Sequence, residues 1–457
     1  MNPITNALII DLTVFTVCAA ALMKVGRISA MHSATIYLFF HLWVVTKRLI
    51  ELNLGAPLSA AFPNQPISLS ELTRAALMFD LTLVVMTAGW VVASALDYKK
   101  NGPLPLPGHE KAPNLSKTYT IGFVRLMVPL ALIGMFLGHG APTTGADGVA
   151  ATTLGTLNLW LPLSLMPLFY WYGPRRWLLG AALVVAYLCE TRMGHTRWLL
   201  LLPTIFFCYA YLSRAGLWWP SRKVMLILAV AGVLWLPGKE ISTVLAHGGG
   251  IGDVAQTISA VWTSSATQAN HPDNQFLDMA AMTVSLVDEK GTFYYGNTVF
   301  PALYNVVPRA IWPDKPQAAQ WELDISTKDR PMSTYGMTAS LMGAAYVDFG
   351  YFGVVIIPFL FALFLGWAYF QAFRCAHYSV GRFAYLVMAC ILFQPYRDGL
   401  YSFFIFNYLS MMPMYFIVLL HLFLPTRPAG SRPRYPRFPR LTPAGADSSS
   451  PALSSRP

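Results

Sequence analysis

The chain has 457 residues, of which 55% are hydrophobic and only 12% are charged. A soluble globular protein carries about 25% charged residues, so this composition excludes a soluble enzyme or binding domain and indicates an integral membrane protein. The formal net charge of +11 lies largely in short connections between apolar runs and in the C-terminal tail, so it implies no nucleic-acid partner.

Apolar runs of about 20 residues match the thickness of the bilayer core. We expect an all-α fold, a polytopic integral membrane helical bundle of about 11–12 spans, because helices satisfy their own backbone hydrogen bonds in lipid. The runs lie near residues 4–23, 34–53, 73–96, 119–138, 154–172, 177–190, 198–213, 224–237, 352–371, 383–396 and 401–424. Connections rich in Lys and Arg alternate onto one side, which predicts that this side and the C-terminus are cytoplasmic.

Four regions follow from this pattern. Residues 1–237 hold about eight spans, 238–351 form one large periplasmic loop, 352–424 hold about three spans, and 425–457 form a disordered basic cytoplasmic tail. Within the loop, residues 276–287 have helical apolar spacing and predict a loop or interfacial helix. The small residues of 337–350 predict close packing under the membrane face.

One end of the second run carries charge. Lys47 and Glu51 have the i,i+4 spacing of an ion pair, and we interpret them, with Arg48 beside them, as an anchor of the helix end.

Charged residues outside the cytoplasmic connections are informative, because topology does not require them. In the turn 190–197, Glu190, Arg192, His195 and Arg197 crowd one outer mouth. They are candidate catalytic or substrate-binding residues, and the alternative is a solvated cap in which Glu190 pairs with an arginine.

A second outer group lies in the loop at 308–316. Pro308 and Pro313 hold the chain extended around Arg309, and Lys315 follows. Trp312 can stack on a sugar ring or lie at the interface. The alternative is an ordered loop that Trp312 pins, with Arg309 on a lipid phosphate.

The last outer turn, 394–399, carries Tyr396, Arg397 and Asp398 beside Pro395 and Gly399. A guanidinium at a helix end can bind an anionic ligand, whereas an ordinary salt bridge that caps the helix is the alternative.

Together these groups predict a cationic outer face that binds a diphosphate, since the planar fork of arginine suits phosphate oxygens. Such a field stabilises a departing diphosphate. The acceptor hydroxyl also needs a base, for which His195, Glu190 and Asp398 are the candidates. The histidines show no metal-ligand spacing and the five cysteines no CxxC, so we expect neither a metal site nor a cofactor.

The motif 308–316, with its proline, arginine and tryptophan, resembles the oligosaccharide repeat-unit polymerases, the Wzy-type O-antigen and exopolysaccharide polymerases. The segments 295–298, 346–353 and 396–399 fit the same pattern. The resemblance implies a metal-independent membrane glycosyltransferase of the GT-C class in the bacterial inner membrane. Its substrates are undecaprenyl-diphosphate-linked glycans, and Arg309 and Arg397 match the family's loop arginines. The chain departs from the family in its count of eleven spans with an outer N-terminus, where members often have about a dozen and a cytoplasmic one.

The resemblance also implies membrane lipid as a partner, together with a chain-length regulator and a flippase of the same pathway. Two other functions stay open. An O-antigen ligase-like transferase uses the same donor, and a lipid-linked oligosaccharide flippase would carry ionisable residues buried within its spans.

Overall fold

The structure is a computed structural model, and it describes residues 2–56, 67–104, 276–304, 339–375 and 380–405. It also describes shorter pieces, including 125–130, 217–223, 252–256 and 311–314. Every element in these parts is a helix and none is a strand, which confirms the all-α prediction for them.

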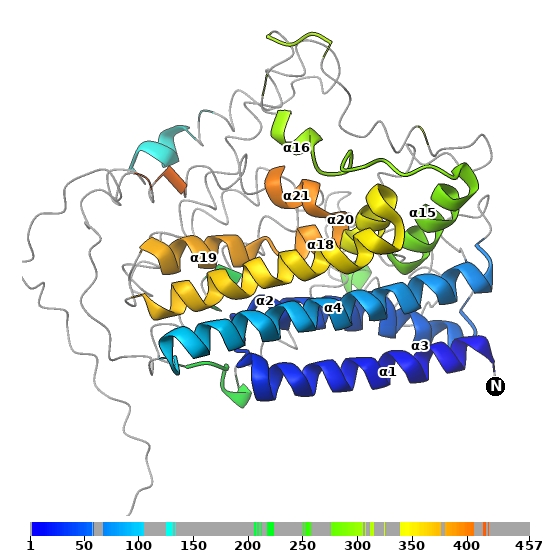
Figure 1. The fold of residues 1–457 in the computed structure, drawn as a ribbon, viewed down its shortest axis with the longest axis horizontal. Coiled ribbons are helices and arrows are strands. Elements are labelled where there is room, and N and C mark those ends of the chain that lie inside the picture. The colour runs from blue at the N-terminus through cyan, green and yellow to red at the C-terminus, as the bar shows by residue number, and fades with distance from the viewer. Residues whose placement is uncertain are drawn as a thin grey trace, which may run out of the picture.

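Three helices are long and apolar enough to cross a membrane. They are α1 (Pro3–Ala21) with its π-helical continuation η1 (Leu22–Gly26), α4 (Leu69–Asn101) and α18 (Ser340–Arg374). All three begin at the same end of the bundle, on the right of Figure 1. We call this the Ser340 end and the opposite one the Arg374 end. They confirm the predicted runs at 4–23, 73–96 and 352–371, while 119–138 to 224–237 and 406–424 lie mostly outside the described residues.

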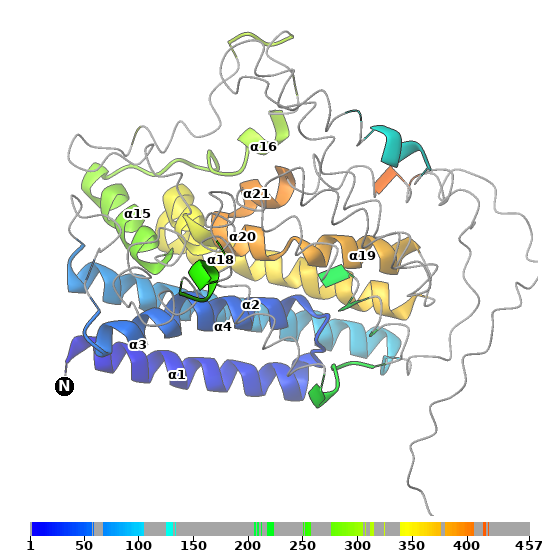
Figure 2. The same ribbon diagram turned by 180° about the vertical axis from the view of Figure 1, so that it is seen from behind.

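The predicted second run returns from the Arg374 end to the Ser340 end (Figure 2). It consists of α2 (Ser33–His41), the π-turn η2 (Leu42–Thr46) and α3 (Lys47–Asn53). At its far end the Thr5 hydroxyl donates to Asn53 Oδ1 at 2.8 Å, which ties α3 to the start of α1.

Helices α4 and α18 approach closely because small residues face each other. A Cβ on Gly89 would lie 2.6 Å from the carbonyl oxygen of Phe359, and one on Gly366 would lie 2.7 Å from Cβ of Ala93. Such contacts between glycine and alanine are a usual means of packing helices in membranes, where van der Waals contact replaces the hydrophobic effect. The pair forms the centre of the described core.

Helix α18 is bent where the predicted loop meets the predicted span. Phe349 (φ −143°, ψ 17°) and Gly350 (φ 60°, ψ −145°) leave helical geometry, and the positive φ suits glycine. The short segment before the bend, 340–348, is almost entirely buried. The predicted close packing of 337–350 is therefore confirmed for its described residues.

The chain after α18 is more broken than its hydropathy suggests. Instead of one span at 383–396, α19 (Val380–Cys390) is followed by two short helices, α20 (Phe393–Asp398) and α21 (Leu400–Ile405). Pro395 has no N–H to donate to Ile391, and the amides of Ile391 and Leu392 bond three residues back, to Met388 and Ala389. The helix is interrupted there and the turn at 394–399 is brought inside the bundle.

Basic residues gather at the Arg374 end. Arg374 pairs with Asp97, with Nε 2.8 Å and NH2 2.5 Å from its two carboxylate oxygens. Arg27 lies over the ring of Tyr98 at 4.0 Å, and Arg382 donates to the carbonyl groups that end α18. The predicted connections at Lys24/Arg27, Lys99/Lys100 and Arg374/Arg382 thus lie at one end of the bundle.

Candidate functional site

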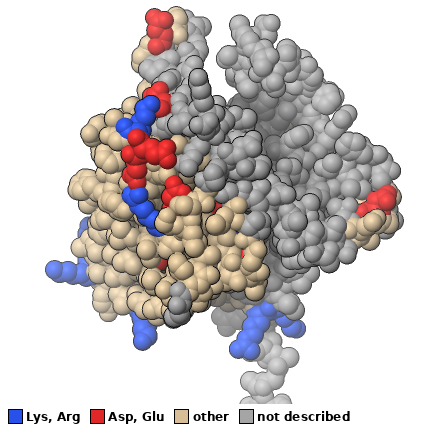
Figure 3. All heavy atoms as spheres, turned by 90° about the vertical axis from the view of Figure 1, so that its right-hand side faces the viewer, with Lys and Arg blue, Asp and Glu red and all other residues tan. Residues whose placement is uncertain are grey.

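The Ser340 end carries a mixed set of acidic and basic side chains. Figure 3 looks onto this end and shows Lys/Arg and Asp/Glu alternating along its surface. The central element is α15 (Phe276–Lys290), which confirms the helix predicted at 276–287. It packs against α4 and α18, and almost every residue from Phe276 to Val287 is buried. The helix is therefore part of the core rather than a segment lying on the membrane surface.

The first turn of α15 holds a buried ion pair with α3. Arg48 Nε and NH2 donate to the two oxygens of Asp278 at 3.0 and 2.7 Å, and the side chains are 2% and 0% exposed. The predicted pair of Lys47 with Glu51 is confirmed at 3.0 Å. Arg48 NH1 also lies 3.7 Å from Glu51 Oε2, but its guanidinium points into the core and pairs with Asp278, which is 230 residues away in the sequence.

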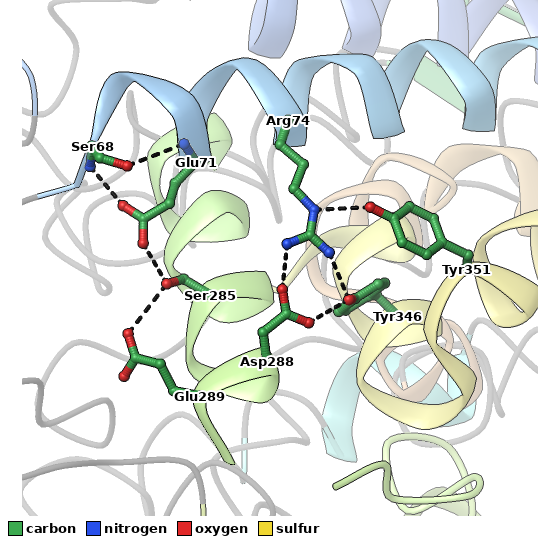
Figure 4. Close-up of polar contacts among 8 residues, drawn as sticks. All are labelled: Ser68, Glu71, Arg74, Ser285, Asp288, Glu289, Tyr346 and Tyr351. Carbon is green, nitrogen blue, oxygen red and sulfur yellow. Dashed lines mark hydrogen bonds and ion pairs between the residues drawn. The ribbon is translucent and has the colours of Figure 1, made fainter. Parts of the chain in front are cut away.

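A second network joins α4, α15 and α18 (Figure 4). Arg74 donates from Nε to the Tyr351 hydroxyl at 2.9 Å, from NH2 to the Tyr346 hydroxyl at 2.8 Å, and from NH1 to Asp288. The Tyr346 hydroxyl in turn donates to Asp288. All three guanidinium nitrogens have a partner, so the Arg74 network acts as a clamp between helices.

The carboxylate of Glu71 extends this clamp. One oxygen accepts from the Ser68 amide at 2.6 Å, closing a capping box at the start of α4, and the other accepts from the Ser285 hydroxyl on α15. The Glu71 side chain therefore caps the start of α4 and also holds α15 against it.

Two of the sequence motifs meet at the bend of α18. The amides of Tyr294 and Tyr295 donate at 3.0 Å to the carbonyl groups of Val347 and Asp348. The buried carboxylate of Asp348 accepts from the hydroxyl and, at 3.2 Å, from the amide of Thr298. The segments 295–298 and 346–353 thus form one folded unit, which fixes where the chain leaves toward α16 (Pro301–Tyr304).

Trp312 lies beside α16. Its ring contacts that of Tyr304 with centroids 5.8 Å apart, and the residue is 41% exposed. Burial raises the pKa of the Tyr304 phenol above its usual value, so that hydroxyl is protonated at neutral pH. Helix α16 packs against α21, which connects the Trp312 segment to the turn at 396–399.

Arg397, in the last turn of α20, lies beside the first turn of α15. Its guanidinium lies 5.4 Å from the ring centroid of Phe276, and its Nε lies 3.0 Å from Asp398 Oδ1 without the alignment of a hydrogen bond. The side chains of Arg397 and Asp398 are 30% and 19% exposed. Among the described residues the two terminal nitrogens of Arg397 have no partner. This arginine can therefore bind an anion without breaking an existing contact.

The turn around Arg397 is rigidly placed. Gly399 has φ 87°, and a Cβ there would lie 2.9 Å from Cβ of Ala344. Tyr396, predicted to bind substrate, is fully buried, and its hydroxyl donates to the Ser33 carbonyl at 3.3 Å. In this structure Tyr396 holds α20 against α2 and does not face a ligand.

The other predicted site residues have no described position. Glu190, Arg192, His195, Arg197, Arg309 and Lys315 lie outside the described residues. Of the predicted groups, the structure therefore places Arg397 beside the first turn of α15 and Asp398 beside Arg397. Tyr396 lies against α2, and Trp312 lies beside Tyr304 of α16.

Sequence analysis did not identify a buried polar cluster that the structure forms among α1, α2 and α4. His41 Nε2 lies 2.7 Å from Asp11 Oδ1 and 3.5 Å from Asp80 Oδ1, and the Thr46 hydroxyl donates to Asp11 Oδ2 at 2.7 Å. These residues come from three helices and share no motif. Polar residues isolated in three separate apolar runs were the only available signal.

Comparison of the chain with protein-family models, with curated proteins and with solved structures finds no match.

Proposed function

We propose that this chain is an integral-membrane glycosyltransferase of the GT-C class. It polymerises undecaprenyl-diphosphate-linked oligosaccharide repeat units into O-antigen or exopolysaccharide. The observation that carries the proposal is Arg397, a partly exposed guanidinium with unused terminal donors beside α15. Arg48 and Arg74, at the same end, already have their nitrogens in contacts within the protein.

The chemistry follows from the charge of the donor. A hydroxyl of the incoming repeat unit attacks the anomeric carbon of the growing glycan, the bond from that carbon to the diphosphate oxygen breaks, and undecaprenyl diphosphate leaves with the electron pair. The Arg397 guanidinium stabilises the negative charge of the leaving group. Arg309, in the motif 308–316, is proposed for the same task.

The proton of the attacking hydroxyl goes to a base, for which Glu190, His195 and Asp398 are the candidates. Asp398 is the one with a described position, with its Oδ1 3.0 Å from Arg397 Nε. Trp312, which is 41% exposed, is proposed to stack on a sugar ring.

The proposed orientation rests on the basic Arg374 end, which the positive-inside rule puts in the cytoplasm. The Ser340 end then faces the periplasm from the inner membrane of a bacterium, where lipid-linked repeat units are presented. The tail 425–457 is cytoplasmic in this arrangement.

A flippase for the same lipid-linked sugar is the second candidate. The buried carboxylates Asp11 and Asp80 with His41 favour it, because ionisable groups inside spans often mark ion-coupled transport.

Complementation of a bacterial strain lacking the native gene tests the proposal. Wild type should restore long surface glycans on a gel, and Arg397→Ala and Arg309→Ala should give single-repeat products at normal membrane abundance. Arg74→Lys, which alters the clamp without touching the proposed site, is the matched control. Long lipid-linked chains left unattached in the deletion strain would instead indicate a ligase. Repeat units trapped on the cytoplasmic leaflet would indicate a flippase.

A further inference from the structure

The cluster of Asp11, His41 and Asp80 is unusual for its surroundings. The three residues are 0%, 0% and 4% exposed, and they lie on helices α1, α2 and α4 of the membrane bundle. The rings of Phe15 and Tyr37 each lie with centroids 6.3 Å from that of His41. Charge in such an apolar setting is costly unless it is neutralised.

The hydrogen bonds within the cluster leave some of its buried polar atoms without a partner. His41 Nε2 faces both carboxylates, but one ring nitrogen carries at most one proton and can donate along one line. That line goes to Asp11 at 2.7 Å. Neither oxygen of Asp80 has a hydrogen-bond partner among the described residues, although Asp80 Oδ1 lies only 3.5 Å from His41 Nε2.

A single cation between the three groups would give both carboxylates and His41 Nε2 a partner, while His41 Nδ1 would stay without one among the described residues. Two carboxylates and a neutral imidazole carry together the charge that a divalent cation neutralises. In a tetrahedral zinc site, ligand atoms lie about 3.3 Å apart, since each is about 2.0 Å from the metal. The distances of 2.7 and 3.5 Å from His41 Nε2 lie on either side of that value, and all three ligand atoms are within 4.8 Å of one another.

The surrounding residues also suit a metal. The Thr46 hydroxyl donates to the second oxygen of Asp11, which is the way that an outer partner orients a ligating carboxylate. Nitrogen and oxygen ligands favour a transition metal such as Zn²⁺ over Ca²⁺ or Mg²⁺, which prefer oxygen alone.

We propose that Asp11, His41 and Asp80 bind one divalent transition-metal ion of the Zn²⁺ type inside the helix bundle. The site shares no residue with the proposed Arg397 site and does not depend on the proposed glycosyl transfer. It would hold α1, α2 and α4 together where the bundle otherwise buries uncompensated charge.

The full chain without a polyhistidine tag, purified in detergent without chelator, should carry about one equivalent of metal by elemental analysis. After removal of the metal, added Co²⁺ should give the visible d–d absorption of a low-symmetry site, and added Zn²⁺ should raise the unfolding temperature. Asp80→Asn should abolish both signals. Its loss of affinity should exceed the 10–100-fold typical of a residue in the outer shell.

His32→Gln is the matched control, because His32 is also a buried histidine, at the N-cap of α2, but its Nδ1 accepts from the Ala34 amide and lies outside the cluster. It should keep the Co²⁺ spectrum. If Asp80→Asn fails to fold, the wild-type titrations still decide the matter. Wild-type protein with no stoichiometric metal, no Co²⁺ absorption and no Zn²⁺ stabilisation would overturn the proposal. In that case a bound proton, and not a metal ion, would neutralise the carboxylates of Asp11 and Asp80.

Discussion

Arg48 and Arg397 both contact the first turn of α15, but they differ in whether their guanidinium nitrogens already have partners. Arg48 is 2% exposed and its fork is matched to both oxygens of Asp278. Arg397 is 30% exposed, rests on the ring of Phe276 and has terminal nitrogens without a partner among the described residues. One arginine stabilises the protein and the other is available to a ligand, so the partners of an arginine indicate its role better than its position does.

The largest expected effect on stability comes from breaking the buried ion pair of Arg48 with Asp278. Arg48→Met leaves the Asp278 carboxylate buried without its counter-charge, which should cost about 3–5 kcal/mol of unfolding free energy. Thermal unfolding of the purified protein, together with its abundance in the membrane, measures this loss.

A second variant tests whether the loss is electrostatic. The double variant Arg48→Met/Asp278→Leu removes both charges, and replacing a buried pair by apolar groups is often close to neutral. It should recover most of the stability. If it is no more stable than Arg48→Met alone, packing rather than unpaired charge explains the effect.

The next largest effect is expected from changing the turn that carries Arg397. Gly399→Ala puts a side chain at φ 87°, ψ 178°, a region almost restricted to glycine, and brings its Cβ to 2.9 Å from Ala344. The expected cost is about 1–3 kcal/mol. The variant should also move Arg397 away from α15 and shorten the surface glycan.

Gly102→Ala is its control. Gly102 has φ 70° but open space around it, at the opposite end of the bundle. It should lose some stability and leave glycan length unchanged. Equal glycan loss in both variants would show that general instability, and not the position of Arg397, limits the product.

Arg48 and Arg397 show which features of the fold and of the candidate site could be predicted from the sequence. Hydropathy located α1, α4 and α18, because a span must satisfy its own hydrogen bonds and carries its signal locally. Helical spacing located α15, and the outer-turn charge identified Arg397. The pairing of Arg48 with Asp278 could not be found this way, since 230 residues separate them and only tertiary packing brings them together.

The same limit explains the other differences. Residues 383–396 are apolar apart from Gln394, and only the backbone shows that the helix stops before Pro395. Asp11, His41 and Asp80 each look like an isolated polar residue in an apolar run, so their common site appears only when three helices are assembled. Tyr396 fits its motif in sequence, but its burial is a property of the fold.

A smaller effect is expected from the clamp in Figure 4. Arg74 and Asp288 are each 37% exposed, so solvent screens their attraction and Arg74→Ala should cost about 1 kcal/mol or less. A double-mutant cycle with Tyr346→Phe measures the coupling. A coupling above about 2 kcal/mol would mean that the network is far better shielded from water than its exposure indicates.

The smallest effect on stability should come from Arg397 itself. Arg397→Ala removes a partly exposed side chain, and its partner Asp398 is itself partly exposed to water. The free energy of unfolding should therefore change by about 0.5 kcal/mol or less. Activity should fall by about 10²–10³, the usual result of removing one donor to a developing negative charge. Arg397→Lys keeps the charge and loses the fork, so it should recover part of the rate.

Arg374→Ala gives the opposite pattern and completes the comparison. Its guanidinium is only 18% exposed and is occupied by Asp97 and by the carbonyl group of Gly102. Its loss should lower stability more than the loss of Arg397, while glycan length per folded molecule stays normal. Stability and activity would then vary independently between two arginines of one bundle, which is expected only if the unused donors of Arg397 contact the substrate. If both variants lose stability and activity in the same proportion, Arg397 is structural and the proposed site must be sought elsewhere.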